Sequence, residues 1–179
     1  MSASKGLFKK YSNPVFVETG TFHGDGVQQA LDEGFNMVYS IELSLELHEQ
    51  CAKRFINNSK VILIQGDSSN ELSKVINNIT VPITFWLDGH YCGVGTAVGR
   101  VNSPLLQELD EIKEHPIKTH TILIDDLRGW HKATRGFDTS DLIKKIEEIN
   151  PSYVFTFEDG YDYNLNIFYP NDILVAKCL

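Results

Sequence analysis

The stretch Val-Phe-Val-Glu-Thr-Gly-Thr-Phe-His-Gly-Asp-Gly, residues 15–26, decides how the rest of the chain is interpreted. It begins with an apolar, β-branched run typical of a buried strand, and this run ends in Glu18. Gly20, Gly24 and Gly26 follow, before a helical pattern begins. Glycines at a strand-to-helix turn adopt positive φ and let the backbone approach a ligand closely. The stretch therefore predicts a nucleotide pocket.

The spacing of these glycines separates two classes of nucleotide pocket. A dinucleotide-binding turn needs the pattern GxGxxG, whereas the pattern from Glu18 to Gly26 is ExGxxxGxG. This pattern resembles the first motif of the class I S-adenosylmethionine-dependent methyltransferases. The resemblance implies that Gly20, Thr21 and Gly24, with Gly26, bind the methionine part of the cofactor and that Glu18 helps to hold its amino group. The alternative is an ordinary glycine-rich turn of an α/β protein.

Composition limits the kinds of protein that this chain represents. Its 179 residues suit one domain, 15–179, after a loose or partly helical lead-in at 1–14. A net charge of −8 argues against a nucleic-acid partner. No apolar run approaches the length of a membrane span, and the start lacks the apolar core of a signal peptide, so we expect a cytoplasmic protein. Three widely separated cysteines indicate free thiols rather than a zinc site.

Strand and helix patterns alternate along the chain. Strands are predicted at 15–17, 37–41, 61–64, 83–87, 121–124, 153–157 and 173–177. Helices are predicted at 25–33, from 45, at 71–76, from 104, and after a cap at Thr139 or Ser140. This alternation predicts a Rossmann-like, doubly wound α/β fold. We expect a seven-stranded, mostly parallel sheet with the last strand antiparallel, which is also the fold that the resemblance implies.

Two long segments are predicted to be loops. The first, 89–103, is interpreted as a functional lid or a mobile segment. The second, 127–138, contains Arg128, which would clamp an acidic acceptor or balance nearby acids. Trp130 lies in the same segment and would cover the acceptor unless it is simply an exposed aromatic.

Acidic residues stand at or just beyond the ends of the first five predicted strands. They are Glu18, Glu42, Asp67, Asp88 and the pair Asp125–Asp126. Ligands of open α/β sheets bind outside these ends, and Glu42 is placed to accept both ribose hydroxyls. By resemblance, Asp67 with Ser68 lies beside the adenine. The alternatives are an exposed acid at position 42 and a helix cap at Asp67 or Ser68.

Asp88, Asp125 and Asp126 form a second constellation, because adjacent strands bring them together. Carboxylates suit a hard cation. The arrangement resembles the metal-dependent small-molecule O-methyltransferases, including those acting on macrolide (macrocin-type) and aminocoumarin sugars, and it implies a Mg²⁺ site. The alternative has no metal, with Asp125 capping a turn, Asp126 solvated and Asp88 bonded to the methionine moiety.

His90 follows Asp88 closely, and an imidazole there can take a proton from an acceptor hydroxyl. Asp88 and His90 are therefore the candidate catalytic residues; His90 is otherwise a structural hydrogen bonder or a further metal ligand. The short lead-in implies an acceptor site that is open, covered by residues 89–103, or completed by a second subunit of a homo-oligomer.

The function predicted from the sequence is methyl transfer from S-adenosylmethionine to a hydroxyl of a small molecule, a sugar or sugar-containing metabolite, with Mg²⁺ assistance. Two alternatives remain open. A small nicotinamide-dependent oxidoreductase is disfavoured by the missing GxGxxG and by the length of the chain. A module that binds the cofactor without turnover would keep the same pocket.

Overall fold

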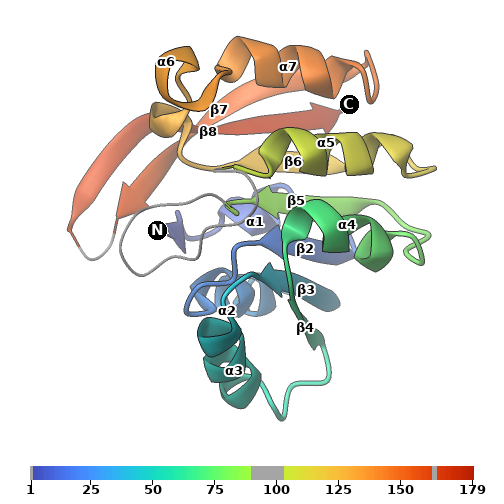
Figure 1. The fold of residues 1–179 in the computed structure, drawn as a ribbon, viewed down its shortest axis with the longest axis vertical. Helices are drawn as coiled ribbons and strands as arrows, with labels where there is room; N and C mark the ends of the chain where they lie inside the picture. The colour runs from blue at the N-terminus through green and yellow to red at the C-terminus, as the bar shows by residue number, and fades with distance from the viewer. Residues whose placement is uncertain (1, 90–102, 163–164) are drawn as a thin grey trace.

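The computed structural model describes residues 2–89, 103–162 and 165–179, which form a mixed sheet between two helical layers (Figure 1). The strands are β1 (Ser2–Ala3), β2 (Val15–Thr19), β3 (Met37–Glu42), β4 (Val61–Gln65), β5 (Ile83–Leu87), β6 (Thr121–Ile124), β7 (Tyr153–Asp162) and β8 (Ile167–Cys178). The helices are α1 (Leu7–Lys10), α2 (Asp25–Asp32), α3 (Leu45–Arg54), α4 (Ser68–Ile76), α5 (Leu105–Glu114), the 3₁₀ turn η1 (Leu127–Gly129), α6 (Lys132–Arg135) and α7 (Thr139–Glu147).

The strand order across the described sheet is β1-β7-β8-β6-β5-β2-β3-β4. Strands β2 to β6 pair in parallel, and β8 runs antiparallel between β6 and β7. The predicted sheet of seven mostly parallel strands with an antiparallel last strand is therefore confirmed. The two-residue strand β1, which pairs with β7, is an addition that was not predicted. Because β2 to β6 are parallel, their carboxyl ends share one edge of the sheet.

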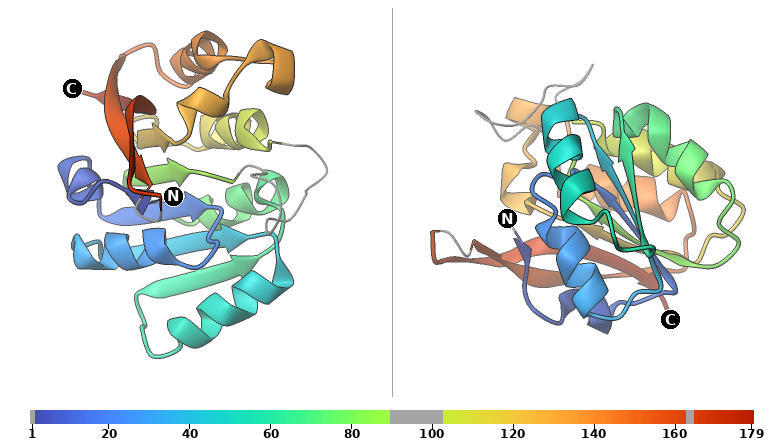
Figure 2. Two further views of the ribbon diagram at one scale, coloured as in Figure 1. Left: turned by 90° about the vertical axis from the view of Figure 1, so that its left-hand side faces the viewer. Right: turned by 90° about the horizontal axis from the view of Figure 1, so that it is seen from below.

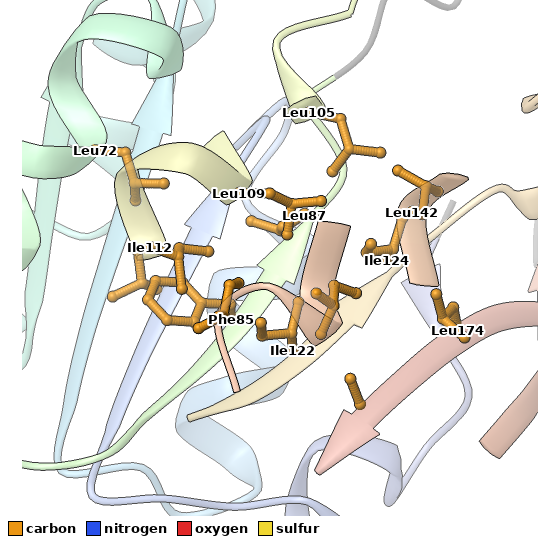
Figure 3. Packing of buried hydrophobic residues seen from close by; sticks show 14 of the residues in the cluster. Leu72, Phe85, Leu87, Leu105, Leu109, Ile112, Ile122, Ile124, Leu142 and Leu174 are labelled. Atoms are coloured by element: carbon orange, nitrogen blue, oxygen red, sulfur yellow. The ribbon is translucent and has the colours of Figure 1, made fainter. Parts of the chain in front are cut away.

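Helices cover both faces of the sheet, as the edge-on view in Figure 2 shows. The residues of α4, α5 and α7 pack on one face, and those of α1, α2 and α3 on the other. Every residue of β5 and β6 is buried, so these strands are apolar throughout rather than alternating. Figure 3 shows Phe85 and Ile122 of these strands packed with Leu109 and Ile112 of α5. No helix in the described ranges combines the length and apolar content that a membrane crossing requires.

Helix beginnings differ from the predictions where a side chain caps the helix earlier. Helix α4 begins at Ser68 rather than at 71, because the Asp67 carboxylate accepts from the Ser69 N–H at 3.0 Å. Helix α7 is capped by Asp138, not by Thr139 or Ser140, in a reciprocal capping box with Asp141. The segment predicted as a loop at 127–138 contains η1 and α6.

The β7–β8 hairpin is much longer than predicted. Strand β8 begins at Ile167 rather than at 173 and contains Pro170 and Asn171, opposite a register shift between Glu158 and Gly160. The outer part of the hairpin extends beyond the neighbouring strands (Figure 1). Ile167 and Phe168 are exposed there and Tyr161 and Tyr169 are only partly buried, so this part of the hairpin pairs outside the core.

The lead-in residues contribute to the core. Phe8 of α1 is fully buried, with its ring centroid 4.7 Å from that of Phe16 and 5.1 Å from that of Trp86. Trp86, at 2% exposure, is therefore a core residue. Tyr11 hydrogen-bonds Glu158 of β7, which ties the lead-in to the far side of the sheet.

Two buried histidines join the amino end of β5 to the end of α5. The Ile83 N–H donates to His120 Nδ1 at 3.1 Å, so His120 carries its proton on Nε2 and donates it to His115 Nδ1 at 3.0 Å. His115 Nε2 is then the donor to the carbonyls of Ile76 and Ile79. Both rings are satisfied when neutral. Burial lowers the pKa of His120 to about 4, with a smaller contribution from His115.

Because these two histidines are buried, we expect the protein to lose stability in acid. The unfolded His120 takes up a proton below its ordinary pKa of about 6.5, whereas the folded ring does so only near 4. Stability contributed by His120 is thus complete above pH 6.5 and falls toward pH 4. The variant His120→Asn keeps an acceptor for the Ile83 N–H but has no imidazole to titrate. Between pH 7.5 and 5, we expect its free energy of unfolding to fall by about 1–2 kcal/mol less than that of the wild type. Urea unfolding at both pH values measures this, and parallel losses in the two proteins would contradict it.

Candidate cofactor and metal site

The turn after β2 lies against the end of β5. Gly20 has φ +86°, and a Cβ on it would stand 2.7 Å from the carbonyl oxygen of Asp88. The Gly20 N–H donates to the Ile41 carbonyl at 2.9 Å, which fixes the turn to β3 as well. Glycine is required here because both the backbone conformation and the space exclude a side chain. Gly20 and Asp88 therefore lie together at the carboxyl edge, as predicted.

The other two glycines of the motif make room for side chains of the protein itself. Gly24 caps α2 at φ +83°, where a Cβ would stand 2.7 Å from the Phe55 ring. A Cβ on Gly26 would stand 1.9 Å from Glu18 Oε1. Glycine is thus needed at these two positions because side chains of the protein itself, Phe55 and Glu18, pack against the backbone there. A direct contact of either glycine with a cofactor stays a prediction.

Glu18 lies under the glycine turn and is only 2% exposed. Ser40 donates to its Oε2 at 2.5 Å, and the Ser40 and Thr21 hydroxyls are 2.6 Å apart. Burial raises the pKa of Glu18 to about 8, against the opposing effect of the Ser40 hydrogen bond, and the nearby Glu42 carboxylate raises it further. The structure thus places Glu18 and Thr21 in one buried network that supports the turn; the predicted bond from Glu18 to a cofactor amino group is not tested.

Glu42 ends β3 with both carboxylate oxygens held by the backbone. Its Oε2 accepts from the Phe22 N–H and its Oε1 from the Ser44 N–H, each at 2.8 Å. The alternative of an exposed acid at position 42 is therefore wrong, since Glu42 is only 6% exposed. Each carboxylate oxygen has a second lone pair, so the pair of oxygens is fixed in place and still able to accept from two hydroxyls.

Asp67 and Ser68 stand at the junction of β4 and α4. The Asp67 carboxylate caps α4, which is the alternative role that the sequence offered for this residue. Ser68 is the first residue of α4 and is 8% exposed. A contact of either residue with an adenine stays a prediction, and a cap does not exclude it.

Asp88, Asp125 and Asp126 converge as the sequence predicted. One carboxylate oxygen from each lies within 4.8 Å of the others. The Asp126 carboxylate is also 2.6 Å from Arg128 Nη2, and Arg128 pairs through Nη1 with Asp172. Asp126 adopts a left-handed conformation at φ +59° before η1, which begins the turn that carries Arg128 back to it. Arg128 therefore balances the acidic edge, one of the two roles considered for it.

Trp130 and His90 were also considered for the site, and the structure describes only the first of them. Trp130 is 3% exposed, stacks on Phe137 and donates from Nε1 to the Asp125 carbonyl at 2.9 Å, so it supports the site from within rather than covering it. His90 lies outside the described residues, as do residues 90–102 of the predicted 89–103 loop.

Sequence reasoning missed one buried acid beside this edge. Glu108 of α5 is 1% exposed, and its carboxyl lies beside Ser68, Thr19 and Gly89. Its position on the apolar face of α5, with Leu105, Leu109 and Ile112, is the pattern that could have identified it.

Solved structures share the fold of this chain. The chain aligns over 97% of its length with the O-methyltransferase TomG from Streptomyces achromogenes in complex with SAM (TM-score 0.65, 12% identity, 77% of that chain). An O-methyltransferase from Bacillus cereus in complex with SAH gives TM-score 0.65, 13% identity and coverage of 97% and 78%. An rRNA methylase from Streptococcus thermophilus gives TM-score 0.56, 14% identity and coverage of 98% and 94%. The chain has the class I methyltransferase fold. No protein-family model and no curated protein sequence matches it.

The contact between Gly26 and Glu18 gives a first test of the site. We expect Gly26→Ala to lower the free energy of unfolding by about 1–3 kcal/mol, because its methyl group overlaps a buried carboxylate. Gly129→Ala is the control, since nothing lies within 4 Å of its Cβ position. Equal stability of the two variants in urea unfolding would contradict the packing described for Glu18.

Proposed function

We propose that this chain is an S-adenosylmethionine-dependent methyltransferase that methylates a hydroxyl of a small molecule, a sugar or sugar-containing metabolite, with the help of a divalent metal ion. The observation that carries the proposal is the fixed carboxylate of Glu42 at the carboxyl edge of a class I methyltransferase fold. A carboxylate oriented by two backbone donors is suited to pair with the two hydroxyls of a ribose.

The rest of the cofactor site follows from the same edge. The ribose at Glu42 would place the adenine toward Asp67 and Ser68, which follow the next strand, β4. The methionine part would extend toward Gly20 and Asp88, which follow β2 and β5. When bound, S-adenosylmethionine supplies the electrophilic methyl group. Its positive charges suit an edge rich in carboxylates.

The aspartates fit a hard cation. Oxygens within 4.8 Å of one another are close enough, after small rotations, to share one ion with ligand distances of about 2.0–2.6 Å. Asp88 and Asp125 would hold Mg²⁺, with Asp126 shared between the ion and Arg128. The ion would lower the pKa of the acceptor hydroxyl. Asp88 would orient the acceptor, and we propose His90 as the base that removes its proton.

A small acceptor is favoured over RNA by the charge of the chain. Its net charge is −8, and Arg128 beside the aspartates is paired with Asp126 and Asp172. Binding RNA requires cations that are available to phosphates. The likeness to rRNA methylases is therefore interpreted as a likeness of fold.

Cofactor binding is the first prediction of this proposal. S-adenosylhomocysteine at about 100 times its Kd should stabilise the native state by about 2.7 kcal/mol, which raises the melting temperature. NAD at the same concentration should not. A shift with NAD alone would favour the oxidoreductase alternative, and binding of S-adenosylmethionine without product in any acceptor screen would favour the non-catalytic module.

Metal use is tested separately. Asp125→Asn should reduce Mg²⁺-dependent methyl transfer by at least about 100-fold, since a charged ligand oxygen is lost, and leave the Kd for S-adenosylhomocysteine within about threefold. Asp110→Asn, at a surface ion pair with Lys145, is the matched control and should keep full activity. Turnover that persists in a chelator would overturn the metal assignment while leaving the cofactor assignment intact.

A further inference from the structure

Glu108 is an acid on the face of α5 whose other buried residues are apolar. It lies in the first turn of α5, whose other buried residues are Leu105, Leu109 and Ile112. Its carboxyl is 1% exposed, and its Oε1 has no hydrogen-bond partner among the described residues. The buried acids Glu42 and Asp172 differ, since backbone N–H groups hold the first and Arg128 the second. A buried polar group left incompletely satisfied calls for a functional explanation.

Three elements of the cofactor edge meet at this carboxyl. The Ser68 hydroxyl at the start of α4 lies beside it and lowers its pKa. The Thr19 hydroxyl at the end of β2 lies beside it without the geometry of a full hydrogen bond. A Cβ on Gly89, just after β5, would stand 3.2 Å from Glu108 Oε1 and 3.1 Å from Thr19 Oγ1. The carboxyl thus lies where the segments after β2, β4 and β5 adjoin.

We propose that Glu108 is a positioning residue for the cofactor site, and that its buried carboxyl sets the spacing of Thr19, Ser68 and Gly89 on which the pocket depends. This inference rests on the proposed function, because the pocket concerned is the same one. Thr19 precedes Gly20, Ser68 follows Asp67 and Gly89 follows Asp88, so a shift at any of the three moves a residue assigned to the cofactor.

The uncharged form is the one that suits this position. A neutral carboxyl can donate as well as accept a hydrogen bond, so it can pair with either hydroxyl without leaving a buried charge. Burial raises the pKa of Glu108 to about 7, the hydroxyls of Ser68 and Thr19 oppose this, and Glu111 of α5 and Asp67 beside α4 raise it further. The neighbouring segments also carry Glu18 before Thr19 and Asp88 before Gly89, which are acids as well. Ionisation above pH 7 would therefore add an uncompensated buried charge.

The test compares cofactor affinity in three variants with the wild type. Glu108→Leu removes the polar contacts from a buried site, and we expect its Kd for S-adenosylhomocysteine to rise at least about tenfold, as when residues that orient a binding site are lost. Glu108→Gln keeps a neutral donor and acceptor and should bind within about threefold of wild type at pH 6. Glu111→Gln, one turn along α5 with its carboxylate on the Ser73 N–H, is the matched control.

The pH dependence separates positioning from general structural support. The ratio of the Kd at pH 8.5 to the Kd at pH 6, measured by calorimetry, should be smaller in Glu108→Gln than in the wild type. Titration of Glu18 is common to all the proteins and cancels in this comparison. Melting temperatures of the ligand-free variants show that they are folded.

Each outcome bears on the proposal. Wild-type affinity in Glu108→Leu, or the same pH ratio in Glu108→Gln and the wild type, would overturn it. If Glu108→Leu does not fold, the pH ratio of Glu108→Gln decides. Failure of the wild type itself to bind S-adenosylhomocysteine would instead overturn the proposed function, and the role of Glu108 with it.

Discussion

The crowding of carboxyl groups at one edge of a parallel sheet is the constraint on which this structure depends. Parallel register places the ends of β2 to β6 side by side, and each end brings an acid. The protein balances these acids by different means. Backbone N–H groups hold Glu42, the start of a helix holds Asp67, and Arg128 pairs with Asp126. Glu18 has its pKa raised by burial instead. A cationic ligand would relieve the remaining repulsion, which links the fold to its proposed cofactor.

The main sheet could be predicted because its central strands, β2, β5 and β6, are buried along their whole length. Continuous apolar runs such as those of β5 and β6 leave few alternatives to a central parallel strand. The outer β7–β8 hairpin could not be predicted, since its far end pairs without being buried and contains Pro170, a residue type that is rare within strands. The lead-in was equally hard to interpret. Phe8 is fully buried in a helix of one turn, too short to show a period.

The candidate site could be predicted at the level of strand ends but not of contacts. The convergence of Asp88, Asp125 and Asp126 followed from topology alone. The partners of these residues depend on local turns, so the return of Arg128 to Asp126 through a left-handed residue was not visible in the sequence. The motif glycines were predicted for a ligand, yet Gly24 and Gly26 make room for Phe55 and Glu18. Glu108 was missed because an acid within a helical pattern is usually solvent-exposed.

The central claim is that S-adenosylmethionine binds at the carboxyl edge formed by β2 to β5, and a crystal structure with S-adenosylhomocysteine tests it most directly. The account predicts the ribose hydroxyls within hydrogen-bond distance of Glu42. It places the adenine beside Asp67 and Ser68, and the amino acid part at Gly20 and Asp88. A ligand bound elsewhere on the chain, or a ribose that leaves Glu42 without a contact, would contradict it.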